Sequence, residues 1–140
     1  MGVAYFLGTT FASGPRSNVK SFIIIRYWWI YMTSKVRVDM SICAHKTLID
    51  ADLQEDGTVK VKIRSTCRDV RDYGKRLGVL TPDEYIQAED SKIMKLACQC
   101  HLTPTCLVPA AVYNVVWIEV GHISKRHALA NKCIGIHFEG

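Results

Sequence analysis

Cysteine is the residue whose placement points to chemistry in this chain. Six cysteines occur among 140 residues, all of them after Met32. Because no secretory signal is recognisable, we expect a reducing, cytoplasmic compartment and six free thiols in place of three disulfides. No C-x-x-C pair occurs, so the signatures of zinc ribbons and thioredoxin-like proteins are absent.

Three of the cysteines stand where predicted elements begin or end. Cys43 follows a strand pattern, Cys67 opens a helical pattern directly after another strand, and Cys106 precedes a further helix. The positive end of a helix dipole lowers a thiol pKa and favours the thiolate. Thiolates that meet at one edge of a small sheet can bind a soft metal ion or an iron–sulfur cluster. We therefore predict Cys43, Cys67 and Cys106 as ligands for zinc or a cluster.

A fourth ligand is sought in the compact run Cys98-Gln99-Cys100-His101. His101 or Cys100 is the candidate, although this spacing matches no named metal-binding module. Free cysteine also packs as a small apolar residue in protein cores. That alternative applies first to Cys98 and to Cys133, which lies in a strand pattern, and it stays open for the other cysteines.

The elements that must position these side chains can be read from the hydrophobic pattern. Alternating apolar residues predict strands over 36–43, 47–53 and 59–64, with a turn at Asp56-Gly57 between the last two. A fourth alternation, Ile134, Ile136 and Phe138, predicts a closing strand.

Three helical regions are expected between the third strand and the closing one. Thr66 resembles the N-cap of a capping box for a helix that runs to Leu77 and stops at Gly78. Thr81-Pro82 begins a second region that runs to about residue 97, with a break near Asp90. A third helix follows from Pro109.

The order β-β-β-α-α-α-β predicts an α+β domain, in which a small, mostly antiparallel sheet carries helices packed on one face. We expect residues 32–140 to form this single domain. Residues 1–31 form a leader that has three basic residues, no acidic residue and no cysteine. Two interpretations of the leader remain open: an interfacial membrane anchor, or an artefact of start-site choice with Met32 as the biological start.

Charge and composition exclude several classes of function. The formal net charge is +5, and 49% of the residues are hydrophobic, as in an ordinary globular domain. The apolar run 22–31 is too short and too charged for a transmembrane segment. G-x-S-x-G, P-loop and G-x-G-x-x-G motifs are absent. A basic row on the third strand, Lys60, Lys62 and Arg64, has no interleaved aromatic residue, which argues against nucleic acid as a partner.

Four short motifs resemble an uncharacterised, cysteine-containing domain family of anaerobic archaea and bacteria. Its members read approximately S-G-I-C-G-F-x-T, S-D-C-P, H-x-x-C-x-V-P and I-E-V. The corresponding segments here are Ser41–Thr47, Ser65–Cys67, Cys106–Pro109 and Ile118–Val120. The resemblance spans about residues 36–138 and implies a shared trio at Cys43, Cys67 and Cys106. Ala44-His45 replaces Gly-Phe, and Arg68 replaces the proline.

Three hypotheses about function follow, and whether the protein is an enzyme is left open. The first is a thiolate-based metal or iron–sulfur binding module. The second is a redox or persulfide-carrying thiol protein in which Cys67 reacts and Cys43 or Cys106 resolves. The third is a metal-free interaction domain whose basic face meets an acidic partner. A protein partner and a homodimer both stay open.

Overall fold

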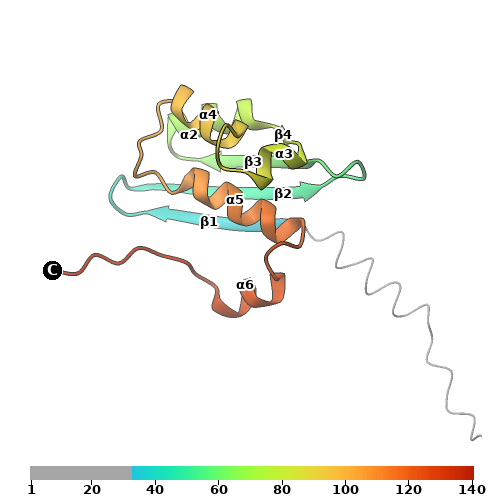
Figure 1. The fold of residues 1–140 in the computed structure, drawn as a ribbon. Helices are drawn as coiled ribbons and strands as arrows, with labels where there is room; N and C mark the ends of the chain where they lie inside the picture. The colour runs from blue at the N-terminus through green and yellow to red at the C-terminus, as the bar shows by residue number, and fades with distance from the viewer. Residues whose placement is uncertain (1–32) are drawn as a thin grey trace, which may run out of the picture. The chain divides into compact units, whose positions relative to one another are not determined.

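The computed structural model describes residues 33–140, so the predictions for the leader and for a start at Met32 lie outside the described residues. Four strands form one sheet in the order β1-β2-β3-β4 (Figure 1). All three neighbouring pairs are antiparallel, which confirms the predicted sheet type. The strands are β1 (Ser34–Met40), β2 (His45–Leu53), β3 (Val59–Ser65) and the two-residue β4 (Val79–Leu80).

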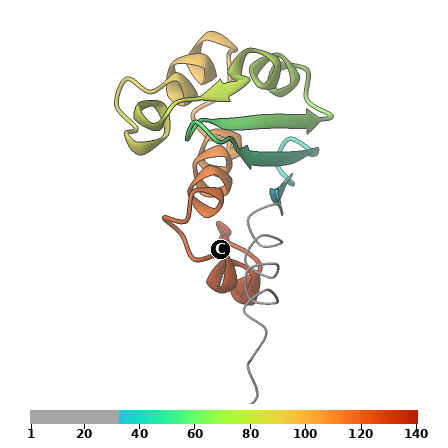
Figure 2. The ribbon, with the colours of Figure 1, turned by 90° about the vertical axis from the view of Figure 1, so that its right-hand side faces the viewer.

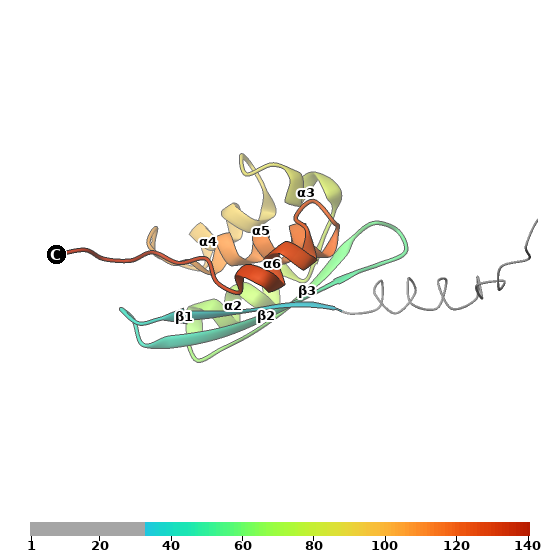
Figure 3. The same cartoon turned by 90° about the horizontal axis from the view of Figure 1, so that it is seen from below.

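Five helices complete the described part of the chain. Figures 1 and 2 show α2 and α4 near β3, and α6 at the other side of the sheet, near β1. In Figure 3, α5 and α6 lie on one side of β1 and β2. None of the helices within residues 33–140 has the length and apolarity needed to cross a membrane. The helices are α2 (Arg68–Leu77), α3 (Pro82–Ile86), α4 (Lys92–Gln99), α5 (Val108–Glu119) and α6 (Lys125–Asn131).

The alternation of the strands decides which face of the sheet the helices cover. Val38, Ile49 and Val61 are buried, whereas their neighbours in sequence point to the opposite, exposed face. Helix α5 packs on β1 and β2, and α2 packs on β3. This confirms an α+β fold with one covered face. The helices contribute these fully or almost fully buried side chains to the core: Val70, Tyr73, Leu77, Ile93, Val108, Val112, Val115 and Val116.

The predicted start is confirmed for one helix, and the predicted cap is wrong for another. Helix α3 begins after Thr81 as predicted, and the Thr81 backbone N–H donates a hydrogen bond to Glu84 Oε2 at 2.8 Å. The predicted capping box at Thr66 is wrong, because Cys67 is the N-cap of α2 and has no side-chain cap hydrogen bond. The Thr66 hydroxyl instead accepts a hydrogen bond from the Lys46 backbone N–H at 3.1 Å, so it ties the end of β3 to β2.

The predicted closing strand is also wrong. Residues 132–140 adopt no regular secondary structure and are exposed throughout. The fourth strand is instead Val79–Leu80, which pairs with Val59 and Lys60 of β3. Alternation shows which face of a strand would be buried, but a strand also needs a neighbour for its backbone groups. The described structure adds the short α6 before this segment, and the break at Asp90 separates α3 from α4 as expected.

Candidate thiol site

Three segments that are distant in sequence meet at one end of the sheet. Cys43 lies in the four-residue turn between β1 and β2, and Cys67 lies two residues after the end of β3. Both β1 and β3 run antiparallel to β2, so their C-terminal ends lie at the same end of the sheet. The loop that carries Cys106 reaches α5 at this end as well (Figure 1). The fold thus gathers the three cysteines that the sequence singled out.

Cys106 is electrostatically coupled to the other two thiols. Burial raises the pKa of its thiol, a hydrogen bond involving the Val108 backbone lowers it, and negative charge on Cys43 or Cys67 raises it further. The net shift is upward, so the expectation of a lowered pKa is wrong for this cysteine: its side chain is half-buried against the core and loses water. Cys106 therefore holds its proton at neutral pH.

Cys43 and Cys67 have different surroundings. Cys43 is exposed, and its Sγ lies 3.8 Å from the Met40 carbonyl oxygen. Cys67 is partly buried against the core, and its backbone N–H donates to Ser65 Oγ at 3.1 Å. The two cysteines therefore differ in solvent access although they lie at the same end of the sheet.

His45, which the sequence offers beside Cys43 as the other candidate nitrogen ligand, lies at this end too. His45 opens β2 two residues after Cys43, and its Nδ1 is 3.0 Å from Thr66 Oγ1, next to Cys67. Because its Nδ1 is engaged in this contact, Nε2 is the ring nitrogen of His45 that is left to bind a metal ion. From the sequence alone, a solvated loop histidine is the simpler interpretation of His45, and its contact with Thr66 makes it a stronger candidate.

The two predicted fourth ligands lie elsewhere in the fold. Cys100 is buried between α2 and α4, where Arg76 Nη1 is 3.5 Å and Asp72 Oδ2 is 3.6 Å from its Sγ. His101 is exposed and adopts a left-handed backbone at the end of α4. Among residues 33–140, no group of three or more histidine, cysteine or carboxylate side chains is already placed to hold a metal ion.

Charges on the open face of the sheet are largely balanced across strands. Asp50 of β2 pairs with Arg64 at 2.9 Å and with Lys35 at 3.9 Å. Lys60 and Lys62 lie opposite Asp52 and Asp50 in the β2–β3 register. The basic row of β3 therefore faces an acidic row on β2, which reduces its attraction for an anionic partner.

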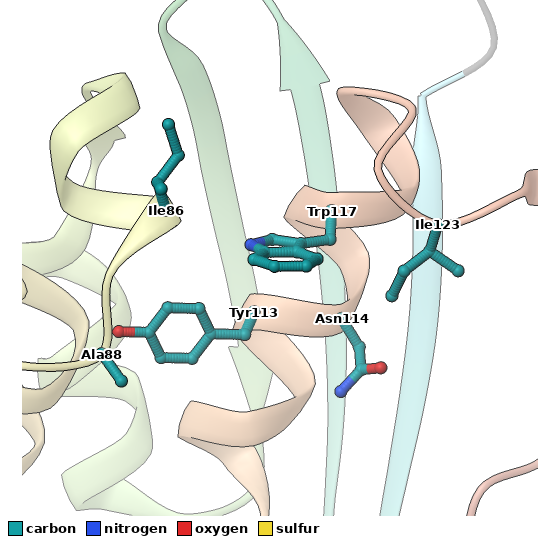
Figure 4. Close-up of a pocket in the computed structure, with 6 residues that line it drawn as sticks. All are labelled: Ile86, Ala88, Tyr113, Asn114, Trp117 and Ile123. Atoms are coloured by element: carbon teal, nitrogen blue, oxygen red, sulfur yellow. The ribbon is translucent and has the colours of Figure 1, made fainter.

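A shallow apolar groove of about 270 Å³ lies between α3 and α5 (Figure 4). The polar atoms of its two aromatic side chains form hydrogen bonds within the domain. Trp117 Nε1–H donates to the Tyr85 carbonyl at 2.7 Å, and the Tyr113 hydroxyl donates to the Gln87 carbonyl at 3.0 Å. No cysteine, histidine or carboxylate lines the groove, so it offers no group for acid–base or nucleophilic chemistry. The lining residues are Ile86, Ala88, Tyr113, Asn114, Trp117 and Ile123.

Fold and site together define a small α+β domain with a helix-covered antiparallel sheet and a cluster of free thiols at one sheet end. The family of unknown function DUF6951 matches residues 34–131, so the chain belongs to this family. That membership confirms the resemblance to an uncharacterised domain family. No curated protein and no solved structure matches the chain.

Proposed function

We propose that this domain binds a soft metal ion, such as zinc, or an iron–sulfur cluster through Cys43, Cys67 and Cys106. The observation that supports the proposal is the arrival of three thiols from three separate segments at one end of the sheet. Thiolates are the preferred ligands of soft metal ions and of iron–sulfur clusters. Free thiols are maintained in a reducing compartment, so the proposal includes a cytoplasmic location.

Electrostatics favour a cation at this position over a reactive thiol. Burial is the main cause of the raised pKa of Cys106, and negative charge on Cys43 and Cys67 raises this pKa further. A bound cation reverses this effect, because it stabilises all three thiolates and displaces their protons. A thiol with a raised pKa is, by contrast, a poor nucleophile near neutral pH, which weighs against Cys106 in a redox or persulfide-carrying role.

Metal binding requires a local movement. Because the three thiols are not yet placed as a ligand set, the exposed turn over residues 41–44 would close on Cys67 and Cys106. The same movement brings His45 with it, and Nε2 of this residue is our preferred fourth ligand. Cys100 is held by α2, and His101 faces solvent, so both are less suitable than the sequence indicated.

The test is a metal count on the full chain, purified without oxygen, with Zn²⁺ and then Co²⁺ as probes. We expect about one metal ion per chain, with the intense visible absorption of cobalt bound by thiolates. Brown protein with acid-labile sulfide would identify a cluster. The variants Cys43→Ser, Cys67→Ser and Cys106→Ser should each lose most of the metal.

Two exposed cysteines provide matched controls. Cys98→Ser and Cys133→Ser remove thiols outside the three converging segments, and both should keep the wild-type metal content. His45→Ala should weaken binding, whereas His101→Ala should not. Equal metal content in the wild type and in all three trio variants would refute the proposal. A metal-free wild type in which Cys67 alkylates much faster than the other thiols would favour the redox alternative.

A further inference from the structure

The C-terminal segment over residues 133–138, here called the tail, has the side-chain pattern of a strand without being one. Ile134, Ile136 and Phe138 alternate with smaller or polar residues, and they are 87%, 64% and 79% exposed. Period-two alternation places these three side chains on one face of an extended chain. The tail therefore presents an apolar ridge that nothing within residues 33–140 covers.

At β1 the sheet has an edge that could pair with such a segment. Because the strand order is β1-β2-β3-β4, β1 is an edge strand with one side that no described strand pairs. Its core-facing residues Val36 and Met40 are only partly buried, whereas Ile49 in the adjacent strand is fully buried. A fifth strand with apolar side chains on this face would pair the open edge and cover Val36 and Met40.

The direction of the tail relative to β1 indicates whether β1 pairs with the tail of its own copy or with that of another copy. The tail leaves α6 and runs toward the end of the sheet that carries the β1–β2 turn, which is also the direction of β1 (Figures 1 and 3). Pairing within one copy would therefore be parallel. Every pair in the sheet is antiparallel, and a twofold axis between two copies would let each tail meet the other β1 in that orientation.

We propose that two copies of this chain form a dimer by tail exchange, in which the tail of each becomes a fifth, antiparallel strand on β1 of the other. Ile134, Ile136 and Phe138 would pack beside Val36 and Met40 under the helices. The interface is isologous, because each copy gives one strand and receives one. The proposal does not depend on metal binding, because the dimer forms through backbone pairing and the burial of apolar side chains.

The test is the mass of the full chain in solution, measured by light scattering over a range of concentrations with reductant present, so that no disulfide links two copies. The wild type should be a dimer. Ile136→Asp should weaken dimerisation by about 100-fold or more, because each dimer loses two buried isoleucine contacts. The tail is exposed in the isolated chain, so this variant should fold normally.

Ile86→Asp is the matched control, because Ile86 is also an exposed isoleucine but lies in the apolar groove. It should remain a dimer. Hydrogen exchange should show protected tail amides in the wild type and loss of that protection in Ile136→Asp. A monomeric wild type, a dimer that Ile136→Asp leaves intact, a dimer that Ile86→Asp dissociates, or an unprotected tail in the dimer would each overturn the proposal.

Discussion

Glu119, the last residue of α5, accepts a hydrogen bond at its Oε2 from the backbone N–H of Ser34 at 2.9 Å, although 85 residues separate them. Its Oε1 lies 3.4 Å from the backbone nitrogen of Leu53. One carboxylate thus ties the end of α5 to the start of β1 and the end of β2. Glu119 lies within Ile118–Val120, one of the motifs that carried the family resemblance, and its role here is structural.

Removing this carboxylate should destabilise the domain. We expect Glu119→Ala to lower the free energy of unfolding by about 1–3 kcal/mol, because two backbone N–H groups lose a charged acceptor. Urea unfolding followed by circular dichroism measures the change. Glu139→Ala, in the exposed segment after the last helix, is the control and should have no effect. Equal midpoints for the two variants would show that the tie contributes nothing.

Gly74 allows α2 to approach β3 closely. A Cβ at this position would lie 2.7 Å from the Cβ of Ile63, which is closer than two side-chain carbons can pack. Gly74→Ala should therefore lower the free energy of unfolding by about 1–3 kcal/mol, even though alanine favours the helix by about 1 kcal/mol.

The double variant Gly74→Ala with Ile63→Gly separates steric overlap from other causes. Since the Cβ of residue 63 is then removed, part of the loss should be recovered relative to the sum of the single variants. Strictly additive losses in the two single variants would mean that Ile63 is not the residue that restricts position 74.

The strands and the gathering of three cysteines could be predicted because both depend on local patterns. Alternation located β1 to β3. In an antiparallel sheet the first and third strands finish at the same end, which places Cys43 near Cys67. Cys100 could not be placed in this way, because its neighbours Asp72 and Arg76 belong to a helix 24 or more residues earlier. The prediction of a closing strand was wrong for a related reason. The side chains of this segment alternate as in a strand, but no local signal shows which sheet edge would pair with its backbone.

Ala44 adopts a left-handed backbone with φ of 58° in the turn beside Cys43. An alanine pays about 1–2 kcal/mol for this conformation, whereas glycine adopts it freely and loses about 0.5–1 kcal/mol of that advantage through its more flexible unfolded chain. Ala44→Gly should thus raise the free energy of unfolding by about 0.5–1 kcal/mol. Ala88, a loop alanine whose own φ is not positive, is the control, and Ala88→Gly should be destabilising. Destabilisation by Ala44→Gly would contradict the conformation of this turn.

The raised pKa of Cys106 predicts how stability changes with pH. An unfolded thiol ionises near pH 8.5, roughly its ordinary value. Well below that pH both states keep the proton, so Cys106 adds no pH dependence. As the pH rises through the unfolded value toward the higher folded one, the unfolded state loses its proton first. The free energy of unfolding should therefore fall, by at most about 1.4 kcal/mol per pH unit for this one thiol.

Cys106→Ala should remove that part of the slope. Urea unfolding at a series of pH values between about 7.5 and 10 measures it, with reductant and chelator present so that neither disulfides nor metal contribute. Cys98→Ala is the matched control: Cys98 is exposed, and this variant should keep the wild-type slope. If wild type and Cys106→Ala lose stability equally with rising pH, Cys106 does not hold its proton more tightly in the folded state, and the electrostatic argument that favours a cation between the three thiols loses its basis.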